Sequence, residues 1–269
     1  DILWRKQKMT EYDPEIYWSR VGQEIQKRGE NYVAGDDNPY YRYKRNKFIR
    51  KFLDTIDFQN KVILEIGFGP GGNLKHLAKY HKCKKILGVD ISKVMFEIAH
   101  QNLNKYKDVV ELRKINCMEL PFQDQSVDVS FTVTVLQHIT DKNMFKRLVQ
   151  EMCRVTKSEI VIIEDIGINQ QLGDEGSWIG RQVDVYKSIF SEYGFRLFNL
   201  EFLNTRISRA WYKSIYELYR RFINNQHKEG DPINFIFRYF IGIPVIFTRY
   251  FDDIFVEKKN LAKMVFHRI

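Results

Sequence analysis

The chain has 269 residues, of which 44% are hydrophobic and 29% are charged. This composition is that of a globular protein with at least one substantial core, and it excludes an extensively disordered chain. The formal net charge is +9, and residues 205–269 hold 12 Lys and Arg against 6 Asp and Glu. Such a basic segment suits a phosphate-bearing ligand, a nucleic acid or an anionic membrane surface, although a basic surface that only keeps the protein in solution is equally common.

The cysteines argue for a reducing compartment. Cys83, Cys117 and Cys153 are odd in number and widely spaced, so we expect free thiols in a cytoplasmic protein without a signal peptide. His81 and Cys83 supply only two metal ligands, and no CxxC pattern or other Cys/His spacing of a metal site is present. The sequence therefore predicts no metal.

Two helices are predicted in residues 1–60. Pro14 suits a first helical turn and Asp13 can cap it, so the first helix is expected over residues 14–28. A turn-rich segment follows, and residues 40–53 then show apolar and aromatic side chains at helical spacing.

From Lys61 onward, short runs rich in Val and Ile alternate with helical stretches. This alternation predicts an α/β fold, with a mostly parallel sheet that helices cover on both faces. A helix at 182–193 would end at Gly194, and a late pair of strands would complete a seven-stranded sheet. The predicted strands are 62–66, 85–90, 109–115, 127–133, 159–164, 195–203 and 261–268.

Residues 205–259 interrupt the late strand pair. The segment has a helical pattern at first and is rich in Phe, Ile and Tyr later. Its most apolar part, 233–255, has an uncharged run of only 10 residues between Arg238 and Arg249, and this run contains Pro244. A membrane-spanning helix needs about 20 apolar residues, so this segment is not expected to span a membrane.

The segment from Glu65 to Gly72 lies between the first strand and the following helix. Glycines there let the backbone turn tightly and approach a ligand at the positive end of a helix. Gly67, Gly69 and Gly72 also match the GxGxxG pattern of dinucleotide-binding proteins, so the glycines alone leave NAD open. Glu65 favours a ligand that bears an ammonium and a sulfonium, because a carboxylate is poorly placed beside a pyrophosphate. Asp90, at the end of the next strand, suits the ribose hydroxyls of either ligand.

Three stretches are similar, in order and spacing, to the first motifs of class I S-adenosylmethionine-dependent methyltransferases: VILEIGFGPGGN, ILGVDIS and INCMELPFQDQSVDVSFTVTVLQHI. The resemblance covers about residues 40–205 and is strongest in 61–139. It implies a Rossmann-like fold, with S-adenosyl-L-methionine as the methyl donor and S-adenosyl-L-homocysteine as the product. We therefore expect a helical lid at 1–60, a donor-binding core at 61–204, an acceptor-binding cap at 205–259 and the last core strand at 260–269.

The resemblance also implies donor contacts for individual residues. Glycines and a carboxylate would hold the methionine moiety, a second carboxylate the ribose, and apolar or small residues the adenine and the rest of the donor. These residues are Glu65, Gly67, Gly69 and Gly71, then Asp90 and Ile91, and then Val133, Thr134 and Leu136 after the fourth strand.

Two further parts of the donor site are expected outside the matching motifs. One departs from the family pattern, and the other lies before the first strand. Many relatives carry an adenine-binding Asp where this chain has Asn116, followed by Cys117 and Met118; the Asn side-chain oxygen can still accept a hydrogen bond from an amine. Related enzymes close the helix before the first strand over the donor, so Tyr41 or Arg45 is a candidate partner of the methionine carboxylate.

The predicted catalytic groups lie at the carboxyl ends of the strands, where ligands of open α/β sheets bind. Methyl transfer is an in-line displacement in which positioning supplies much of the acceleration, but a hydroxyl acceptor usually needs a base. His138, after the fourth strand, is the first candidate. Glu164 and Asp165, at the end of the fifth strand, are the alternatives, and they form no recognisable metal triad with Asp141.

The acceptor is expected to meet basic and aromatic side chains. Arg181 and Tyr186, on the helix after a polar loop, are predicted to face the cleft, and Arg220 and Arg221 lie among aromatic residues of the insertion. This mixture suits a sugar, a phosphorylated sugar or an amphipathic lipid-linked acceptor, and it also suits stacked RNA bases. We favour a small-molecule or glycan acceptor, because the basic residues are dispersed. Peripheral contact with a membrane is compatible with 233–255, whose apolar residues would otherwise complete the core.

Four functions therefore remain open. They are methyl transfer to a small molecule, sugar or lipid-linked glycan, RNA methylation, NAD-dependent oxidoreduction, and donor binding without catalysis. Glu65 and the Leu-Pro-Phe segment disfavour the oxidoreductase, and the intact glycine motif weighs against a non-catalytic protein. The sequence favours the first function.

Overall fold

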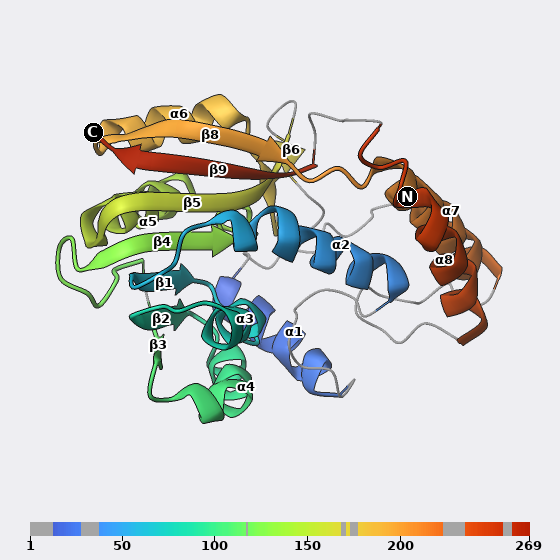
Figure 1. Cartoon of the computed structure of the whole chain (residues 1–269), viewed down its shortest axis with the longest axis horizontal. Coiled ribbons are helices and arrows are strands. Elements are labelled where there is room, and N and C mark those ends of the chain that lie inside the picture. Colours follow the sequence, from blue (N-terminus) through green and yellow to red (C-terminus); the bar gives the residue numbers. More distant parts are fainter. Residues whose placement is uncertain are drawn as a thin grey trace, which may run out of the picture.

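A seven-stranded sheet organises the protein (Figure 1). The computed structural model describes residues 13–27, 38–116, 118–167, 171–172, 177–222, 235–254 and 260–269. The strands are β1 (Val62–Ile66), β2 (Lys85–Asp90), β3 (Val110–Lys114), β4 (Val127–Val133), β5 (Thr156–Ile166), β8 (Phe195–Phe202) and β9 (Asn260–Arg268).

The strand order is β3-β2-β1-β4-β5-β9-β8. β1 pairs in parallel with β2 and β4, and the parallel pattern continues to β3 and β5. Only β9 runs against its neighbours, β5 and β8. The predicted Rossmann-like, mostly parallel sheet of seven strands is confirmed.

Helices cover both faces of this sheet, which explains why its strands are apolar on both sides. α5 (Lys142–Val155) and α6 (Val183–Glu192) pack on one face, together with the short helix η3 (Leu136–His138). On the other face lie α2 (Pro39–Lys51), η1 (Leu53–Thr55), α3 (Gly72–Tyr80), α4 (Lys93–Leu103) and the short helix η2 (Asn104–Tyr106).

The first helix, α1 (Pro14–Lys27), packs on α4, where Ile25, Met95 and Ile98 are buried together. The Asp13 side chain accepts a hydrogen bond from the Ile16 N–H at 3.0 Å, which confirms it as the N-cap. α2 begins one residue earlier than the sequence suggests, because Asn38 caps it by accepting from the N–H groups of Tyr40 and Tyr41.

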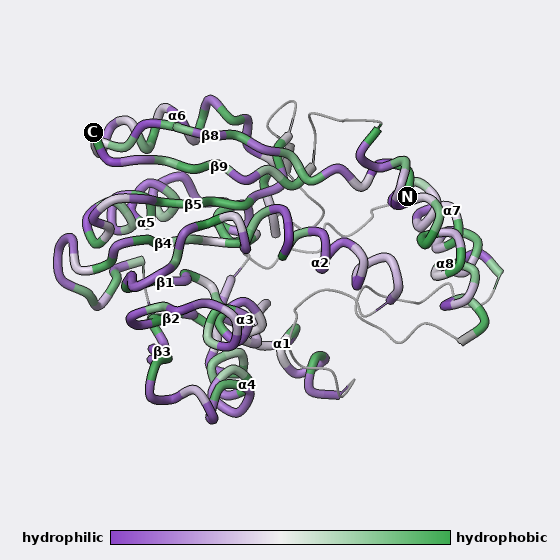
Figure 2. The backbone as a smooth tube through the Cα atoms, in the orientation of Figure 1, coloured by the Kyte–Doolittle hydropathy of each residue, from purple (hydrophilic) through white to green (hydrophobic). Residues whose placement is uncertain are grey.

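The insertion between β8 and β9 contains α7 (Arg206–Phe222) and α8 (Phe235–Thr248), which lie side by side (Figure 1). They are antiparallel, since the hydroxyls of Ser208 and Thr248 are 2.8 Å apart and Trp211 donates to the Phe240 carbonyl. Hydrophobic residues are frequent in the central strands and again in α7 and α8 (Figure 2). No helix among the described residues is long and apolar enough to cross a membrane.

The segment that follows β5 contains a feature absent from the sequence-based expectations. β6 (Gln171–Leu172) and β7 (Ile179–Gly180) form a small antiparallel sheet where a polar loop was expected. β7 leads directly into α6, and the Ile166–Arg181 bridge ties this excursion to the end of β5.

Candidate donor and acceptor site

The turn between β1 and α3 is made by glycine. Gly67, Gly69 and Gly71 have φ angles of +73°, +53° and +84°, a region that other residues rarely adopt. At Gly67 a Cβ atom would also lie 2.4 Å from Val135 Cγ2, which is far inside van der Waals contact. The sequence therefore needs glycine here both for the backbone path and for the close approach of η3.

This turn opens into a cavity of about 130 Å³ at the carboxyl ends of β1, β2 and β4. Its wall contains eight of the predicted site residues together with residues of α1 that close it. The predicted ones are Gly67, Gly69, Asp90, Ile91, Met118, Val133, Thr134 and His138, and the closing ones are Pro14 and Trp18. Leu136 is buried beneath this region rather than in its wall.

Asp90 is buried at the end of β2, and backbone groups hold its carboxylate. One oxygen accepts from the Gly69 N–H at 2.8 Å and the other from the Ser92 N–H at 2.8 Å. Burial raises the pKa of Asp90 to about 6, and these hydrogen bonds oppose that rise. The carboxylate thus couples the glycine turn to the start of α4, and its remaining lone pairs can accept from two ribose hydroxyls.

Glu65 is buried one strand away. One of its oxygens accepts from Asn73 Nδ2 at 2.7 Å, and the Asn73 oxygen accepts from Arg45 at 3.1 Å. The second oxygen, Oε2, is buried and has no hydrogen-bond partner among the described residues. Burial raises the pKa of Glu65 to about 8, and Asn73 and Arg45 oppose this.

These carboxyls fit the methyl donor that the motifs imply. An unsatisfied buried carboxyl oxygen is costly, so it favours a ligand that brings a hydrogen-bond donor or a cation. The donor's ammonium would supply both at Glu65, and Arg45, which is linked to Glu65 through Asn73, would be available for its carboxylate. Its sulfonium supplies an electrophilic methyl group.

His138 is held in a defined orientation. Its Nδ1 lies 2.8 Å from the Ser177 carbonyl oxygen, which can only accept, so Nδ1 carries the proton. The other nitrogen, Nε2, then has the lone pair that a base requires, and Gln137 Nε2 approaches it at 3.4 Å. The Trp18 ring lies edge-on to the imidazole with the ring centres 4.9 Å apart. His138 remains the best-placed candidate base.

Glu164, which was predicted as an alternative base, is buried and its oxygens already accept hydrogen bonds. It is fully buried and accepts hydrogen bonds from the N–H groups of η3 and its N-cap and from Thr132. Three backbone N–H groups are involved, those of Val135, Leu136 and Gln137, at 3.0 to 3.1 Å. Both oxygens are occupied, so Glu164 positions the segment that carries His138.

Asp165 follows on β5 and points to the opposite face, since side chains alternate along a strand. It is partly exposed, and its backbone N–H donates to Gln137 Oε1 at 2.9 Å. Burial is the main cause that raises the pKa of Tyr40 to about 12, and the Asp165 charge adds to it. Asp165 therefore faces α2 and stays a candidate for contact with an acceptor.

Arg181 and Tyr186 require a correction. Arg181 precedes α6 rather than lying on it, and its guanidinium is buried against the Phe145 ring at 4.0 Å. It donates to the carbonyls of Leu136 and Ile139. Tyr186 is fully buried in the core. Arg181 thus supports η3, whereas Tyr186 packs edge-on against Phe145 of α5 and does not reach the cleft.

The remaining predicted residues are scattered. Asn116 is exposed and already accepts a hydrogen bond from Lys114, and Cys117 lies outside the described residues. Tyr41 lies edge-on to Tyr40 and Tyr212 and so contacts the inserted helices, not the donor cavity. The predicted acceptor residues Arg220 and Arg221 are exposed at the end of α7.

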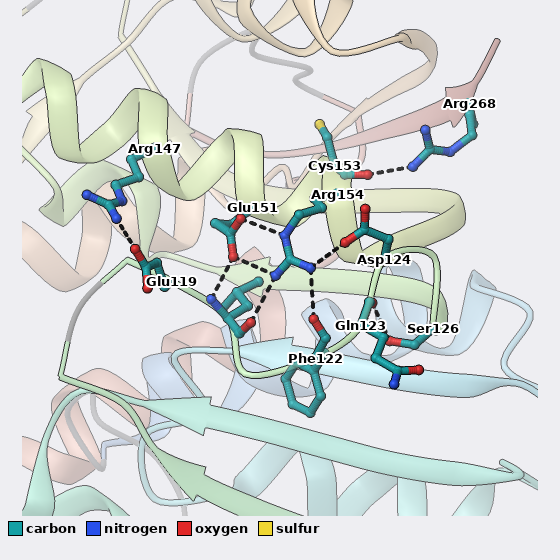
Figure 3. A network of polar contacts seen from close by, with 11 residues as sticks. Glu119, Phe122, Gln123, Asp124, Ser126, Arg147, Glu151, Cys153, Arg154 and Arg268 are labelled. Atoms are coloured by element: carbon teal, nitrogen blue, oxygen red, sulfur yellow. Dashed lines mark hydrogen bonds and ion pairs between the residues drawn. The ribbon is translucent and has the colours of Figure 1, made fainter.

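Arg154, which the sequence did not single out, fixes the Leu-Pro-Phe segment (Figure 3). It extends from α5 and donates to the carbonyls of Leu120 and Phe122 and to the carboxylates of Asp124 and Glu151. Glu151 in turn accepts from the Leu120 N–H at 2.9 Å. This clamp holds the loop that brings Met118 to the cavity. The sequence could not predict this role, because Arg154 lies on a separate helix about 30 residues after the Leu-Pro-Phe segment.

Comparison with known proteins finds methyltransferases. A family described as a methyltransferase domain matches residues 63–159. A tRNA (guanine-N(7)-)-methyltransferase from Francisella tularensis subsp. novicida is 32% identical over 113 residues, which are 40% of this chain and 47% of that protein. Ajmaline N-methyltransferase from Rauvolfia serpentina is 29% identical over 118 residues, 42% of this chain and 38% of that protein. Each match thus spans less than half of the relative's own length.

Solved structures share the fold over nearly the whole chain. The [4+2]-cyclase SpnF has a TM-score of 0.63 and 14% identity, covering 94% of this chain and 95% of its own. Geranyl diphosphate C-methyltransferase from Streptomyces coelicolor A3(2), solved with S-adenosyl-L-homocysteine, has a TM-score of 0.60 and 12% identity, covering 95% and 96%. The cyclase shows that this fold alone does not fix a reaction. The family match, the glycine turn and the two buried carboxyls together identify residues 63–159 as part of a class I S-adenosylmethionine-dependent methyltransferase domain.

Proposed function

We propose that the protein transfers a methyl group from S-adenosyl-L-methionine to a hydroxyl or amine of a small-molecule, sugar or lipid-linked glycan acceptor. The observation that carries this proposal is the cavity that joins Asp90 to His138, with Glu65 buried beside it. Arg45, Glu65 and Asp90 would hold the donor, and His138 would take the proton of a hydroxyl acceptor through Nε2. Pro14 and Trp18 of α1 close one side of this cavity, which would help to hold donor and acceptor in line for transfer.

A basic groove supports an anionic acceptor. It runs between α2 and α8, and its wall combines positive charges with tyrosines: Arg42, Arg50, Lys51, Arg249, Tyr43 and Tyr239. Arg45 lies on a neighbouring side of α2 and faces Glu65 through Asn73. α2 therefore connects the donor cavity with a surface that suits phosphate or sugar groups.

The outer face of α8 supports an acceptor that is presented at a membrane. Six large apolar side chains of this helix are each more than half exposed: Ile236, Tyr239, Phe240, Ile243, Ile246 and Phe247. An apolar face of this kind is unusual on a water-soluble monomer. Arg249 at one end and Arg220 and Arg221 near the other provide the basic flanks of an interfacial helix.

The catalytic part is tested by measuring donor-dependent formation of S-adenosyl-L-homocysteine across acceptor classes: amines, sugars, sugar phosphates, lipid-linked sugars and tRNA. Turnover with a sugar or lipid-linked acceptor supports the proposal. Donor binding without turnover on any of these classes would leave a binding protein and refute it.

The membrane part is tested separately by co-sedimentation with vesicles of anionic and of neutral phospholipid. We expect binding to anionic vesicles at low salt, and its loss in Ile243→Ser/Phe247→Ser. The matched control is Phe198→Ser, an equally exposed aromatic on β8. Equal sedimentation of all three proteins would contradict a membrane role for α8.

RNA methylation is a second candidate, because tRNA methyltransferases are among the relatives and the net charge is +9. RNA binding by the basic groove would weaken steeply with salt. Methylation of tRNA in the acceptor screen, lost in Arg42→Ala/Arg50→Ala, would favour this function over the first.

A further inference from the structure

Two histidines and one aspartate meet at the edge of the sheet opposite the donor cavity. Asp54 lies in η1, His76 on the last turns of α3, and His81 directly after α3. Both imidazole Nε2 atoms approach the same Asp54 oxygen, His76 at 2.6 Å and His81 at 3.1 Å. One ligand atom from each side chain lies within 4.8 Å of the others, the only such group of three or more among the described residues.

We propose that Asp54, His76 and His81 bind a zinc ion that joins η1 to α3. Two imidazole nitrogens and a carboxylate oxygen form a common zinc donor set, whereas Mg²⁺ and Ca²⁺ prefer oxygen ligands alone. With metal–ligand bonds of about 2.0–2.1 Å, the ligand atoms of a tetrahedral site lie about 3.3 Å apart. The present separations of 2.6 and 3.1 Å would have to open by about 0.7 and 0.2 Å, and the two imidazole nitrogens, which lie within 4.8 Å of each other, would settle at the same spacing.

The scaffold holds the three side chains in place for such an ion. Leu53 and Leu77, which neighbour the ligands in η1 and α3, are both fully buried in one core cluster. The His81 N–H donates to the Leu77 carbonyl at 2.9 Å, so His81 stays on the axis of α3. The imidazoles are mostly buried while the Asp54 side chain is 38% exposed, which leaves a path for the ion and a fourth position for water.

The ion would support the fold and, because His76 also lines the groove between α2 and α8, one wall of that groove. α3 begins at the glycine turn of the donor cavity and His81 follows its last residue, so the ion would lie a helix length from the methyl donor. It would tie α3 to the chain segment that leaves α2, the helix that carries Arg45. This inference is independent of the proposed methyl transfer.

Untagged protein, freed of metal with a chelator, is titrated with Zn²⁺ against a chromophoric competitor. We expect one zinc per chain, no competition by Mg²⁺, and an affinity at least tenfold lower in His76→Gln and in His81→Gln. His100→Gln and Cys83→Ser are the controls and should bind as the wild type does. Unchanged affinity in the two variants, or loss in Cys83→Ser, would overturn the assignment.

A measurement on the wild-type protein avoids any defect in folding of the variants. Acylation of histidines by diethyl pyrocarbonate is followed by mass spectrometry with and without Zn²⁺. The ion should protect His76 and His81 and leave the exposed His100 reactive. Equal modification of all three histidines in both conditions would refute the site.

Discussion

The donor cavity and the α7–α8 pair lie at the same end of the sheet but are built by different means. In the cavity wall, the buried carboxylate of Asp90 is tied to the backbone N–H groups of Gly69 and Ser92. At the helix pair, stacked tyrosines and exposed apolar side chains dominate, and Tyr212 of α7 stacks on Tyr40 of α2 with the ring centres 4.8 Å apart. Backbone-bound carboxyls depend on a local motif and tolerate little change, whereas a surface of aromatic rings admits many sequences. Substitutions at the two places should therefore differ in kind and in size.

The largest effect is expected at His138. His138→Ala should lower kcat for a hydroxyl acceptor by about 10²–10⁴, because the base that takes the proton is lost. The Kd of the donor should stay nearly unchanged. Steady-state kinetics with His100→Ala as control checks this, and an amine acceptor should be much less affected. An unchanged kcat on a hydroxyl would shift the role to Asp165.

Asp90→Ala should act on donor binding instead. Loss of a charged hydrogen-bond acceptor costs about 1.5–3 kcal/mol, which corresponds to roughly a 10–150-fold rise in the donor Kd. Calorimetry measures it, with Asp57→Ala as the control because that carboxylate is exposed before β1. Normal donor binding by Asp90→Ala, together with tight binding of NADH by the wild type, would refute the cofactor assignment.

The pH dependence of donor binding tests Glu65. With its pKa raised to about 8, this carboxyl is mostly protonated at pH 7 in the free protein. A bound cation favours the ionised form, so binding releases a proton and tightens as the pH rises towards 8, by up to about tenfold per pH unit. Above the raised pKa this gain levels off.

Calorimetry in two buffers of different ionisation enthalpy counts the protons released. Glu65→Gln serves as the control, because it removes the contribution of the chain and keeps the titration of the donor's own amine. The variant should bind more weakly, with a flatter pH profile. Identical proton release by both proteins would mean that Glu65 does not meet the ammonium.

The smallest effect is expected in the helix pair. Arg220→Ala/Arg221→Ala should raise the KM for an anionic acceptor by only about fivefold, since exposed charges contribute about 1 kcal/mol or less. Donor binding should not change. If KM is unaltered at low salt, these arginines are not acceptor contacts, and the helix pair tolerates substitution even better than the donor cavity does.

The sheet and the glycine turn could be predicted because their signals are local. Apolar runs of four to seven residues predict the strands. Position 67 needs glycine, because the Cβ atom of any other residue would clash with Val135. Asp13 and Gly194 likewise act on neighbouring backbone, and both stand where the sequence placed them.

The roles of Glu164, Arg181 and Trp18 could not be predicted, because each depends on contacts between distant segments. Glu164 meets the N–H groups of a short helix 27 to 29 residues earlier in the chain. Trp18 reaches His138 because α1 packs on α4 and closes the donor cavity. The Asp54 cluster escaped notice for the same reason, since its members come from two elements with no common motif.

One hydrogen bond determines how the inserted helices are joined to the sheet. The Leu203 N–H donates to the Leu261 carbonyl at 2.8 Å, so the chain leaves β8 and returns to β9 at almost the same point. A tight reverse turn could close that gap without disturbing the register of either strand. Helices of another length or composition could be grafted there as easily, without any change to the strands whose ends form the donor cavity.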